Sequence, residues 1–196
     1  MGSIEGVVDV PEGRSSSDLR LRDARADELD EAAGLLGEVY GVFRAHFPPQ
    51  AWEGYIGEII DVRRRLGESE MIVAERAGGL VGTVGFYPDA SRSALERWPE
   101  GWASIRTLAV RDDARGQGVG DALARECLRR ARARGVRVIG LHTASYLAAA
   151  TCLYARLGFR RAPEFDIEIG EMFTGRSLPP GESWQAQAYR LDLEEV

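Results

Sequence analysis

The fold is decided by the stretch Leu108-Ala109-Val110-Arg111-Asp112-Asp113-Ala114-Arg115-Gly116-Gln117-Gly118-Val119-Gly120-Asp121. Its pattern predicts a strand over 104–110, a turn with three glycines at alternate positions, and a long amphipathic helix over 119–134. The first amides of a helix have no intrahelical acceptor and carry the positive end of the helix dipole. Because glycines leave those amides accessible, the turn is suited to binding a pyrophosphate.

A dinucleotide-binding turn is the weaker interpretation of the same glycines. That turn needs Gly-x-Gly-x-x-Gly, and here the third glycine comes one residue early. The stretch also lies in the middle of the chain, after a hairpin predicted from strands over 71–75 and 80–87, and it does not open a β-α-β unit. Dinucleotide binding therefore ranks second.

Hydrophobic periodicity on both sides of this stretch predicts an α/β domain of the α+β type, with one mixed central sheet flanked by about four helices. Residues 1–17 are rich in Gly, Ser, Pro and acidic side chains and predict a mobile leader, so one domain is expected over 18–196. Residues 88–103 are expected to form an irregular insertion. The other expected strands are 19–22, 136–141, 159–161 and 187–193, and the other expected helices start at Asp27, after Pro48-Pro49 (running to 63–65) and at Leu147.

Arginine supplies all 25 basic residues of the 196-residue chain, which has a formal charge of −6 and contains no lysine and no asparagine. A Schiff-base lysine, a Walker-type phosphate-binding lysine and an N-glycosylation acceptor are therefore excluded. Neither the two histidines, His46 and His142, nor the two cysteines, Cys127 and Cys152, have metal-ligand spacing, so no metal is expected. Both cysteines fall in apolar helical patterns and are predicted to be buried free thiols.

Charge and hydropathy predict a cytoplasmic protein. No run of 18 apolar residues and no signal-peptide pattern is present, so a membrane is not an expected partner. Basic residues gather over 111–161, where they form a solvated arginine face on the helix over 119–134 or mark an anion site. The chain as a whole is acidic and has no nucleic-acid-reading motif, so nucleic acid is not expected as a partner.

Two motifs, at the family's usual separation, resemble the GNAT superfamily of acyl-CoA-dependent N-acyltransferases. The first, Arg/Gln-x-x-Gly-x-Gly/Ala after a strand, is matched by Arg115, Gly118 and Gly120. The second, Tyr-x-x-x-Gly-Phe near the end of the following helix, is matched by residues 154–159. The order of the expected elements fits the family from about residue 19 to residue 193. The resemblance implies a GNAT-like domain whose signature strand and next strand splay apart at the cofactor site.

The resemblance also implies acetyl-CoA as the co-substrate. The pantetheine arm would pair with main-chain groups of the signature strand, and the pyrophosphate would lie on the amides of the glycine turn. The amide of Leu108 would stabilise the oxyanion of the tetrahedral intermediate that forms when the amine attacks directly. The implied cofactor-binding residues are Leu108, Ala109, Val110, Arg115, Gly116, Gln117, Gly118, Val119, Gly120 and Asp121.

Two side chains are candidates for catalytic proton transfer. Tyr154 lies where family members often place the acid that protonates the leaving thiolate, and an aromatic packed between helix and sheet is the alternative. His142 ends the strand after the long helix, where it either takes the amine proton or is a hydrogen-bonded structural residue. Ser104 departs from the family pattern, because other members carry a glutamate base at this position.

These features predict an N-acetyltransferase that acts on a primary amine of a small molecule or a peptide. The alternative is a non-catalytic acyl-CoA-binding or regulatory module, because serine at position 104 cannot act as a base alone. The family favours a homodimer. Aromatic residues are candidates for the acceptor pocket, although those at helical spacing are also typical of a core: Tyr40, Phe43, His46, Phe47, Trp52, Tyr55, Trp98, Trp102, Phe173 and Trp184.

Overall fold

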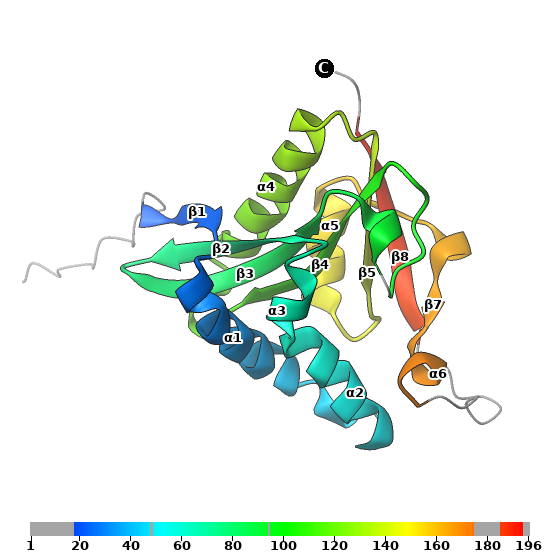
Figure 1. The fold of residues 1–196 in the computed structure, drawn as a ribbon, viewed down its shortest axis with the longest axis horizontal. Helices are drawn as coiled ribbons and strands as arrows, with labels where there is room; N and C mark the ends of the chain where they lie inside the picture. Colours follow the sequence, from blue (N-terminus) through cyan, green and yellow to red (C-terminus); the bar gives the residue numbers. More distant parts are fainter. Residues whose placement is uncertain (1–17, 48, 94, 175–184, 194–196) are drawn as a thin grey trace, which may run out of the picture.

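The computed structural model describes residues 18–47, 49–93, 95–174 and 185–193. Its strands form one mixed sheet in the order β1-β2-β3-β4-β5-β8-β6, and β7 pairs with β8 off this path (Figure 1). Neighbouring strands are antiparallel except β4 and β5, which are parallel. The strands are β1 (Arg20–Asp23), β2 (Glu70–Arg76), β3 (Gly79–Tyr87), β4 (Trp102–Val110), β5 (Val138–Thr143), β6 (Arg160–Arg161), β7 (Ile167–Glu168) and β8 (Gln185–Asp192).

Helices cover both faces of this sheet (Figure 1). On one face, α1, α2 and α3 bury an apolar stripe that includes Leu36, Ile59 and Val62. On the other face, α4 and α5 bury a larger cluster that includes Leu123 and Leu153. The helices are α1 (Leu29–Gly41), α2 (Pro49–Ile60), α3 (Val62–Arg65), α4 (Val119–Ala133), α5 (Ala148–Arg156) and α6 (Ile169–Thr174).

The predicted fold class is confirmed, and the two elements around the glycine turn are found where the sequence predicts them. The helix expected over 119–134 is α4, and the strand expected over 104–110 is β4, which begins two residues earlier. The helix expected from Pro49 to 63–65 is instead broken at Asp61. There the Asp61 carboxylate accepts a hydrogen bond from the amide of Arg64 at 3.1 Å and caps the new helix α3. The predicted leader, 1–17, lies outside the described residues.

The pairing of β4 with β5 ends partway along both strands. Parallel pairing runs from Trp102 opposite Val138 to Ile105 opposite Leu141, whereas β4 continues to Val110. The antiparallel register of β3 with β4 shifts in the same place, where two residues of β4, Thr107 and Leu108, lie opposite one residue of β3, Val84. This bulge puts Thr107 at a φ of +51°, in the left-handed region that a β-branched residue rarely adopts. The bulge re-aims the second half of β4 away from β5.

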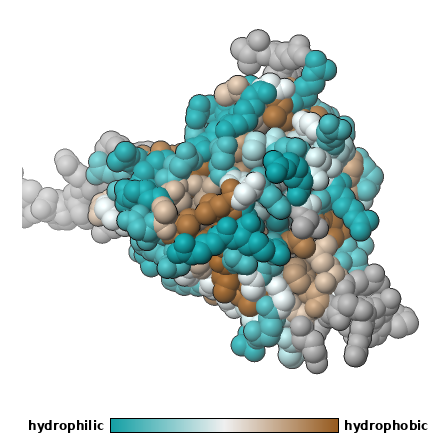
Figure 2. Space-filling view, viewed as in Figure 1, coloured by the Kyte–Doolittle hydropathy of each residue, from teal (hydrophilic) through white to brown (hydrophobic). Residues whose placement is uncertain are grey.

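The two cysteines differ in exposure. Cys127 is buried as predicted, but the prediction of a buried thiol is wrong for Cys152, which is exposed. The core-facing stripe of α5 runs through Leu153 and Tyr154 and leaves Cys152 on the outer side. On the face shown in Figure 2, polar residues dominate and apolar residues form only small patches. Within the described ranges, no helix has the length and apolar character needed to span a bilayer.

Candidate functional site

The N-terminus of α4 begins at a glycine and borders open space. Its N-cap is Gly118, with a φ of +81°, and no side chain caps the helix. A Cβ atom added at Gly116 or Gly118 would meet no described atom within 4 Å. The first amides of α4 therefore remain accessible, and their orientation suits a diphosphate. This arrangement suits the nucleotide end of coenzyme A, and the binding of the coenzyme by these residues stays a prediction.

Side chains of the glycine turn hold the turn itself in place. Arg115 donates to the carbonyl oxygen of Val110 at 3.3 Å and to the Asp112 carboxylate at 2.7 Å. Gln117 donates to the carbonyl oxygen of Asp113 at 2.8 Å. Asp121 accepts from Arg125 at 2.6 Å. Gln117 also accepts a hydrogen bond from Arg76 of β2. These side chains thus have protein partners, and the main-chain amides stay the predicted anion-binding groups.

The second half of β4 brings the predicted cofactor-binding residues together. A Cβ atom added at Gly120 would lie 3.6 Å from both Val110 and Leu153 and 3.7 Å from Leu108. The glycine turn, the strand and α5 therefore meet at Gly120. The carbonyl oxygen of Leu108 accepts a long hydrogen bond, 3.4 Å, from the hydroxyl of Tyr40 in α1. Ala109 is buried against the α1 side of the sheet.

Tyr154 lies in the core between α5 and the sheet. Its ring packs edge-on against Phe159 with ring centres 5.7 Å apart, and the residue is 6% exposed. Burial raises the pKa of the Tyr154 phenol far above the ordinary value. The phenol therefore keeps its proton at neutral pH, as a proton donor must.

Both ring nitrogens of His142 have fixed partners. Nδ1 lies 3.2 Å from Oε1 of Glu96, and Nε2 lies 2.9 Å from the carbonyl oxygen of Phe165. Both partners are acceptors, so the imidazole can satisfy both only when it carries two protons. The ring is also 4.7 Å from that of Trp98. His142 thus ties β5 to the segment 88–101 and to the loop before β7.

Glu96 is the residue that the sequence analysis missed. Its carboxylate is buried, and Oε2 accepts from the indole of Trp98 at 2.8 Å and from the hydroxyl of Ser104 at 2.7 Å. Burial alone would raise the pKa of Glu96, but the hydrogen bond to His142 and the charge of Arg106 outweigh burial and lower it. Glu96 therefore stays ionised. The signal that could have revealed it is an acidic residue two positions before Trp98, in a segment that contains two tryptophans.

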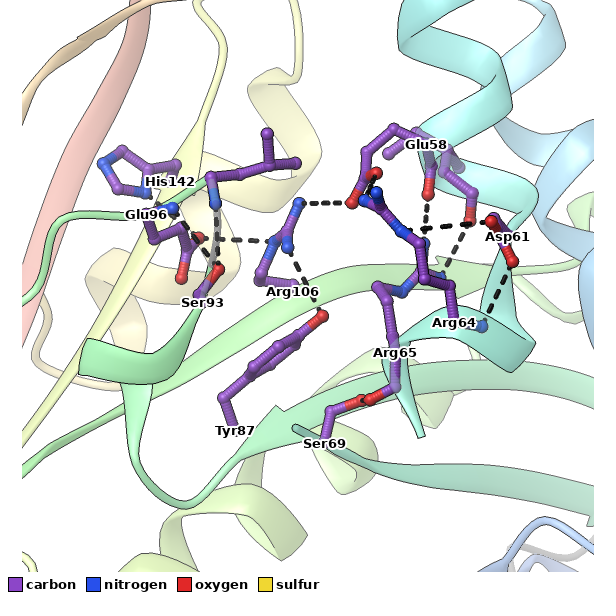
Figure 3. Close-up of polar contacts among 12 residues, drawn as sticks. Glu58, Asp61, Arg64, Arg65, Ser69, Tyr87, Ser93, Glu96, Arg106 and His142 are labelled. Atoms are coloured by element: carbon purple, nitrogen blue, oxygen red, sulfur yellow. Dashed lines mark hydrogen bonds and ion pairs between the residues drawn. The ribbon is translucent and has the colours of Figure 1, made fainter. Parts of the chain in front are cut away.

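Arg106 occupies the centre of this polar group (Figure 3). Its guanidinium lies 3.5 Å from Glu96 of the segment 88–101 and 3.6 Å from Glu58 of α2. It also donates to the hydroxyl of Tyr87 at 3.3 Å and lies over that ring. The guanidinium is thus held between two carboxylates that come from opposite sides of β4.

A cavity of about 120 Å³ opens beside Arg106, between α2, β4, β5 and α6. Two buried hydroxyls near it, Thr107 on β4 and Thr143 on β5, have no hydrogen-bond partner among the described residues. A buried polar group without a partner is costly, so such groups indicate where a ligand or water completes a site. Its aromatic and charged lining residues include Tyr40, Tyr55, Glu58, Glu96, Arg106 and Tyr146.

The predicted aromatic residues divide into separate groups. Tyr40, Tyr55 and Phe173 line the cavity. Phe43, His46 and Phe47 extend the same aromatic wall by packing on Tyr146, with the His46 and Tyr146 rings stacked 4.4 Å apart. Trp52 is buried, and Trp98 stacks on Trp102 in another cluster. Trp184 lies outside the described residues.

Comparisons with known proteins identify relatives of this chain. A family model described as "Acetyltransferase (GNAT) family" matches residues 29–159. An L-methionine sulfoximine/L-methionine sulfone acetyltransferase from Pseudomonas aeruginosa is 30% identical over 133 residues, covering 66% of this chain and 67% of that protein.

Solved structures show the same fold at lower identity. The PaiA N-acetyltransferase from Thermoplasma acidophilum, in complex with coenzyme A, matches with a TM-score of 0.65 and 11% identity over 89% of this chain and 99% of that one. The yncA protein from Salmonella typhimurium, with its cofactor acetyl-CoA, matches with a TM-score of 0.59 and 20% identity over 92% of this chain and 96% of that one.

Proposed function

This chain belongs to the acetyltransferase (GNAT) family, and we propose that it transfers the acetyl group of acetyl-CoA to a primary amine of a small molecule or a peptide. Family membership confirms the resemblance drawn from the glycine turn and residues 154–159. The observation that carries the proposal is the parting of β4 from β5 after Ile105, directly beside the uncapped N-terminus of α4. Together they offer an unpaired strand edge and a set of anion-binding amides.

Each part of this surface has a role in the proposed transfer. The amides of residues 115–121 bind the diphosphate, and the main-chain groups of Leu108, Ala109 and Val110 align the pantetheine arm. The amide of Leu108 polarises the acetyl carbonyl and stabilises the oxyanion that forms when the amine attacks. When bound, acetyl-CoA supplies the activated acetyl group and a thiolate leaving group.

Tyr154 is the proposed acid for the departing thiolate. Its pKa is raised by burial, so the hydroxyl keeps a proton to give. It lies on α5 next to Leu153, which packs against the glycine turn at Gly120. This position lies beside the proposed coenzyme-binding surface.

The amine must lose a proton, and His142 has two candidate roles in that step. As a base it would need a free lone pair, whereas both of its nitrogens already face the acceptors Glu96 and the Phe165 carbonyl oxygen. This geometry supports the second role, in which the imidazole fixes the Glu96 carboxylate beside the cavity. The amine proton then leaves through water.

The acceptor proposed here is a small amine rather than a protein. The relative from P. aeruginosa is named for two small amino-acid derivatives, and the cavity beside Arg106 has a mostly apolar and aromatic lining with a few polar groups, as small-molecule sites have. The cytoplasmic location and the homodimer stay predictions.

An amine panel tests the proposal. Release of free CoA from acetyl-CoA is measured with amino acids, amino-acid amides, alkylamines, polyamines and short peptides. Turnover with at least one amine class supports the transferase. Binding of CoA in titration calorimetry without turnover on any amine would instead support the non-catalytic acyl-CoA-binding module.

A further inference from the structure

Arg106 has more hydrogen-bond donors than its neighbours accept. A guanidinium carries five N–H donors, and charge-assisted hydrogen bonds to carboxylates normally measure about 2.7–2.9 Å. Among the described residues, the closest polar contact of Arg106 is the Tyr87 hydroxyl at 3.3 Å, and the two carboxylates lie at 3.5 and 3.6 Å. The side chain is nevertheless only 12% exposed. A buried cation with partners this distant has room for a further acceptor.

The two carboxylates near Arg106 are engaged elsewhere. Glu96 accepts from Trp98, Ser104 and His142, and Glu58 accepts from Arg64 on the far side of the group (Figure 3). The neighbouring Arg65 is buried and donates to the main-chain oxygens of Glu58 and Ile59. Its guanidinium is therefore held by carbonyl groups.

Much of the remaining cavity wall is aromatic. Tyr40, Tyr55 and Phe173 line it, and Tyr55 packs edge-on against Phe173 with ring centres 5.8 Å apart. Met172 of α6 adds a thioether. Such a wall accepts an apolar or thioether side chain and offers no partner for a second charge. The cavity lining thus combines the guanidinium of Arg106, flanked by Glu58 and Glu96, with a largely aromatic and apolar remainder.

We propose that this cavity binds a free α-amino acid with an apolar or thioether side chain, and that Arg106 binds its α-carboxylate. This inference rests on the proposed function and names its acceptor class. The amino group sits one carbon from the carboxylate, so anchoring the carboxylate on β4 places the amine close to the same strand, on which the Leu108 amide follows two residues later. A peptide has no carboxylate beside its amino terminus and would leave Arg106 unsatisfied.

The test compares matched acceptors that differ only at the carboxylate. For the methionine side chain these are L-methionine, L-methioninamide and 3-(methylthio)propylamine, and the same triplets are made for leucine and phenylalanine. We measure kcat/KM with acetyl-CoA and, separately, binding to CoA-saturated protein by titration calorimetry. Because the acid and the amide differ in amine basicity, the acid-to-amide ratio is compared between protein variants as well as within the wild type.

Two variants of Arg106 and one control variant test whether the acid-to-amide ratio depends on Arg106. Arg106→Gln removes the charge, and Arg106→Lys keeps the charge and removes the planar fork. Arg129→Gln alters an exposed arginine of α4 that forms an ion pair with Glu126. We expect Arg106→Gln to weaken binding and kcat/KM for the acids by roughly ten- to a hundredfold, mainly through KM, and for the amides by less than about threefold. Arg106→Lys should fall between, and Arg129→Gln should match the wild type.

The outcomes separate this inference from the proposed function. If the wild-type protein binds the acid no better than the amide in all three triplets, the carboxylate site is overturned. This comparison does not require Arg106→Gln to fold. An acid-to-amide ratio that survives in folded Arg106→Gln or in Arg106→Lys overturns the role of Arg106. Acids that bind CoA-saturated protein in an Arg106-dependent way, without CoA release from any amine, would support the carboxylate site while the transfer reaction fails.

Discussion

Nδ1 of His142 lies 3.2 Å from Oε1 of Glu96, so the end of β5 is tied to the segment between β3 and β4. The other carboxylate oxygen of Glu96 accepts from Ser104 at 2.7 Å. The family resemblance implies a glutamate at the position of Ser104, and here the Glu96 carboxylate reaches the Ser104 side chain from a neighbouring loop. The departure at Ser104 therefore does not leave this part of the site without a carboxylate.

We expect Gly118→Val to abolish CoA binding while the fold is retained. The valine side chain would occupy the open space before the first amides of α4. Gly135→Val is the matched control, because Gly135 also has a positive φ, +69°, and open space around it, at the other end of α4. Both variants should lose about 1–2 kcal/mol of stability from backbone strain. Unchanged CoA affinity of Gly118→Val in titration calorimetry would place the diphosphate elsewhere.

Local patterns account for what the sequence predicts well. The glycine turn, β4 and α4 are contiguous, and their signals are a strand period, alternate glycines and a helical stripe. Signals of this kind need no knowledge of distant residues. The break at Asp61 shows where local reading fails, because the apolar pattern continues across it and the carboxylate cap on Arg64 becomes visible only in the structure.

The polar group around Arg106 could not be predicted in the same way. Glu58, Glu96, Arg106 and His142 come from α2, a loop, β4 and β5, and no spacing in the sequence links them. The register shift that puts Thr107 in the left-handed region also has no local marker, since the position carries a β-branched residue rather than glycine. Long-range packing decides both features.

Tyr154→Phe should lower kcat by roughly ten- to a thousandfold and leave KM for acetyl-CoA nearly unchanged. The hydroxyl acts on the leaving thiolate, which carries charge only as the C–S bond breaks. Tyr189→Phe, on the half-buried β8, is the control and should turn over like the wild type. If Tyr154 only packs the core, Tyr154→Phe will keep wild-type kcat and differ in thermal stability alone.

Protonation of Glu28 in acid should make the protein less stable. Its carboxylate accepts two hydrogen bonds from Arg22, both at 2.6 Å, and one from the amide of Arg25 at 2.8 Å. The hydrogen bonds from Arg22 lower the pKa of Glu28 to about 2, whereas an unfolded glutamate titrates near ~4.3. A lowered folded-state pKa means that this stabilisation is complete above about pH 5 and is lost as the pH falls towards 2.

Thermal unfolding across pH tests this effect. Glu28→Gln should lower Tm by about 2–6 °C at pH 7, and the difference from the wild type should shrink steadily between pH 5 and pH 2. Asp27→Asn is the control, because the Asp27 carboxylate is exposed and comes no closer to the Arg25 guanidinium than 3.9 Å. A Tm difference between Glu28→Gln and the wild type that stays constant with pH would mean that the charge of Glu28 does not contribute to stability.

His142→Gln separates the two roles of the imidazole. Glutamine keeps hydrogen bonding and similar size but cannot titrate, so a catalytic base would lose the acid limb of its kcat/KM profile and about a hundredfold in rate. A positioning role predicts a smaller loss, an unchanged limb and a lower Tm, because the contacts with Glu96 and the Phe165 carbonyl oxygen are weakened. We expect the second result, since both ring nitrogens are already engaged.

The substrate amine ionises too and gives a limb of the same shape, so the profile is measured with two amines of different pKa. A limb that follows the amine in both proteins would assign proton removal to water, and a limb that disappears only in His142→Gln would assign it to His142.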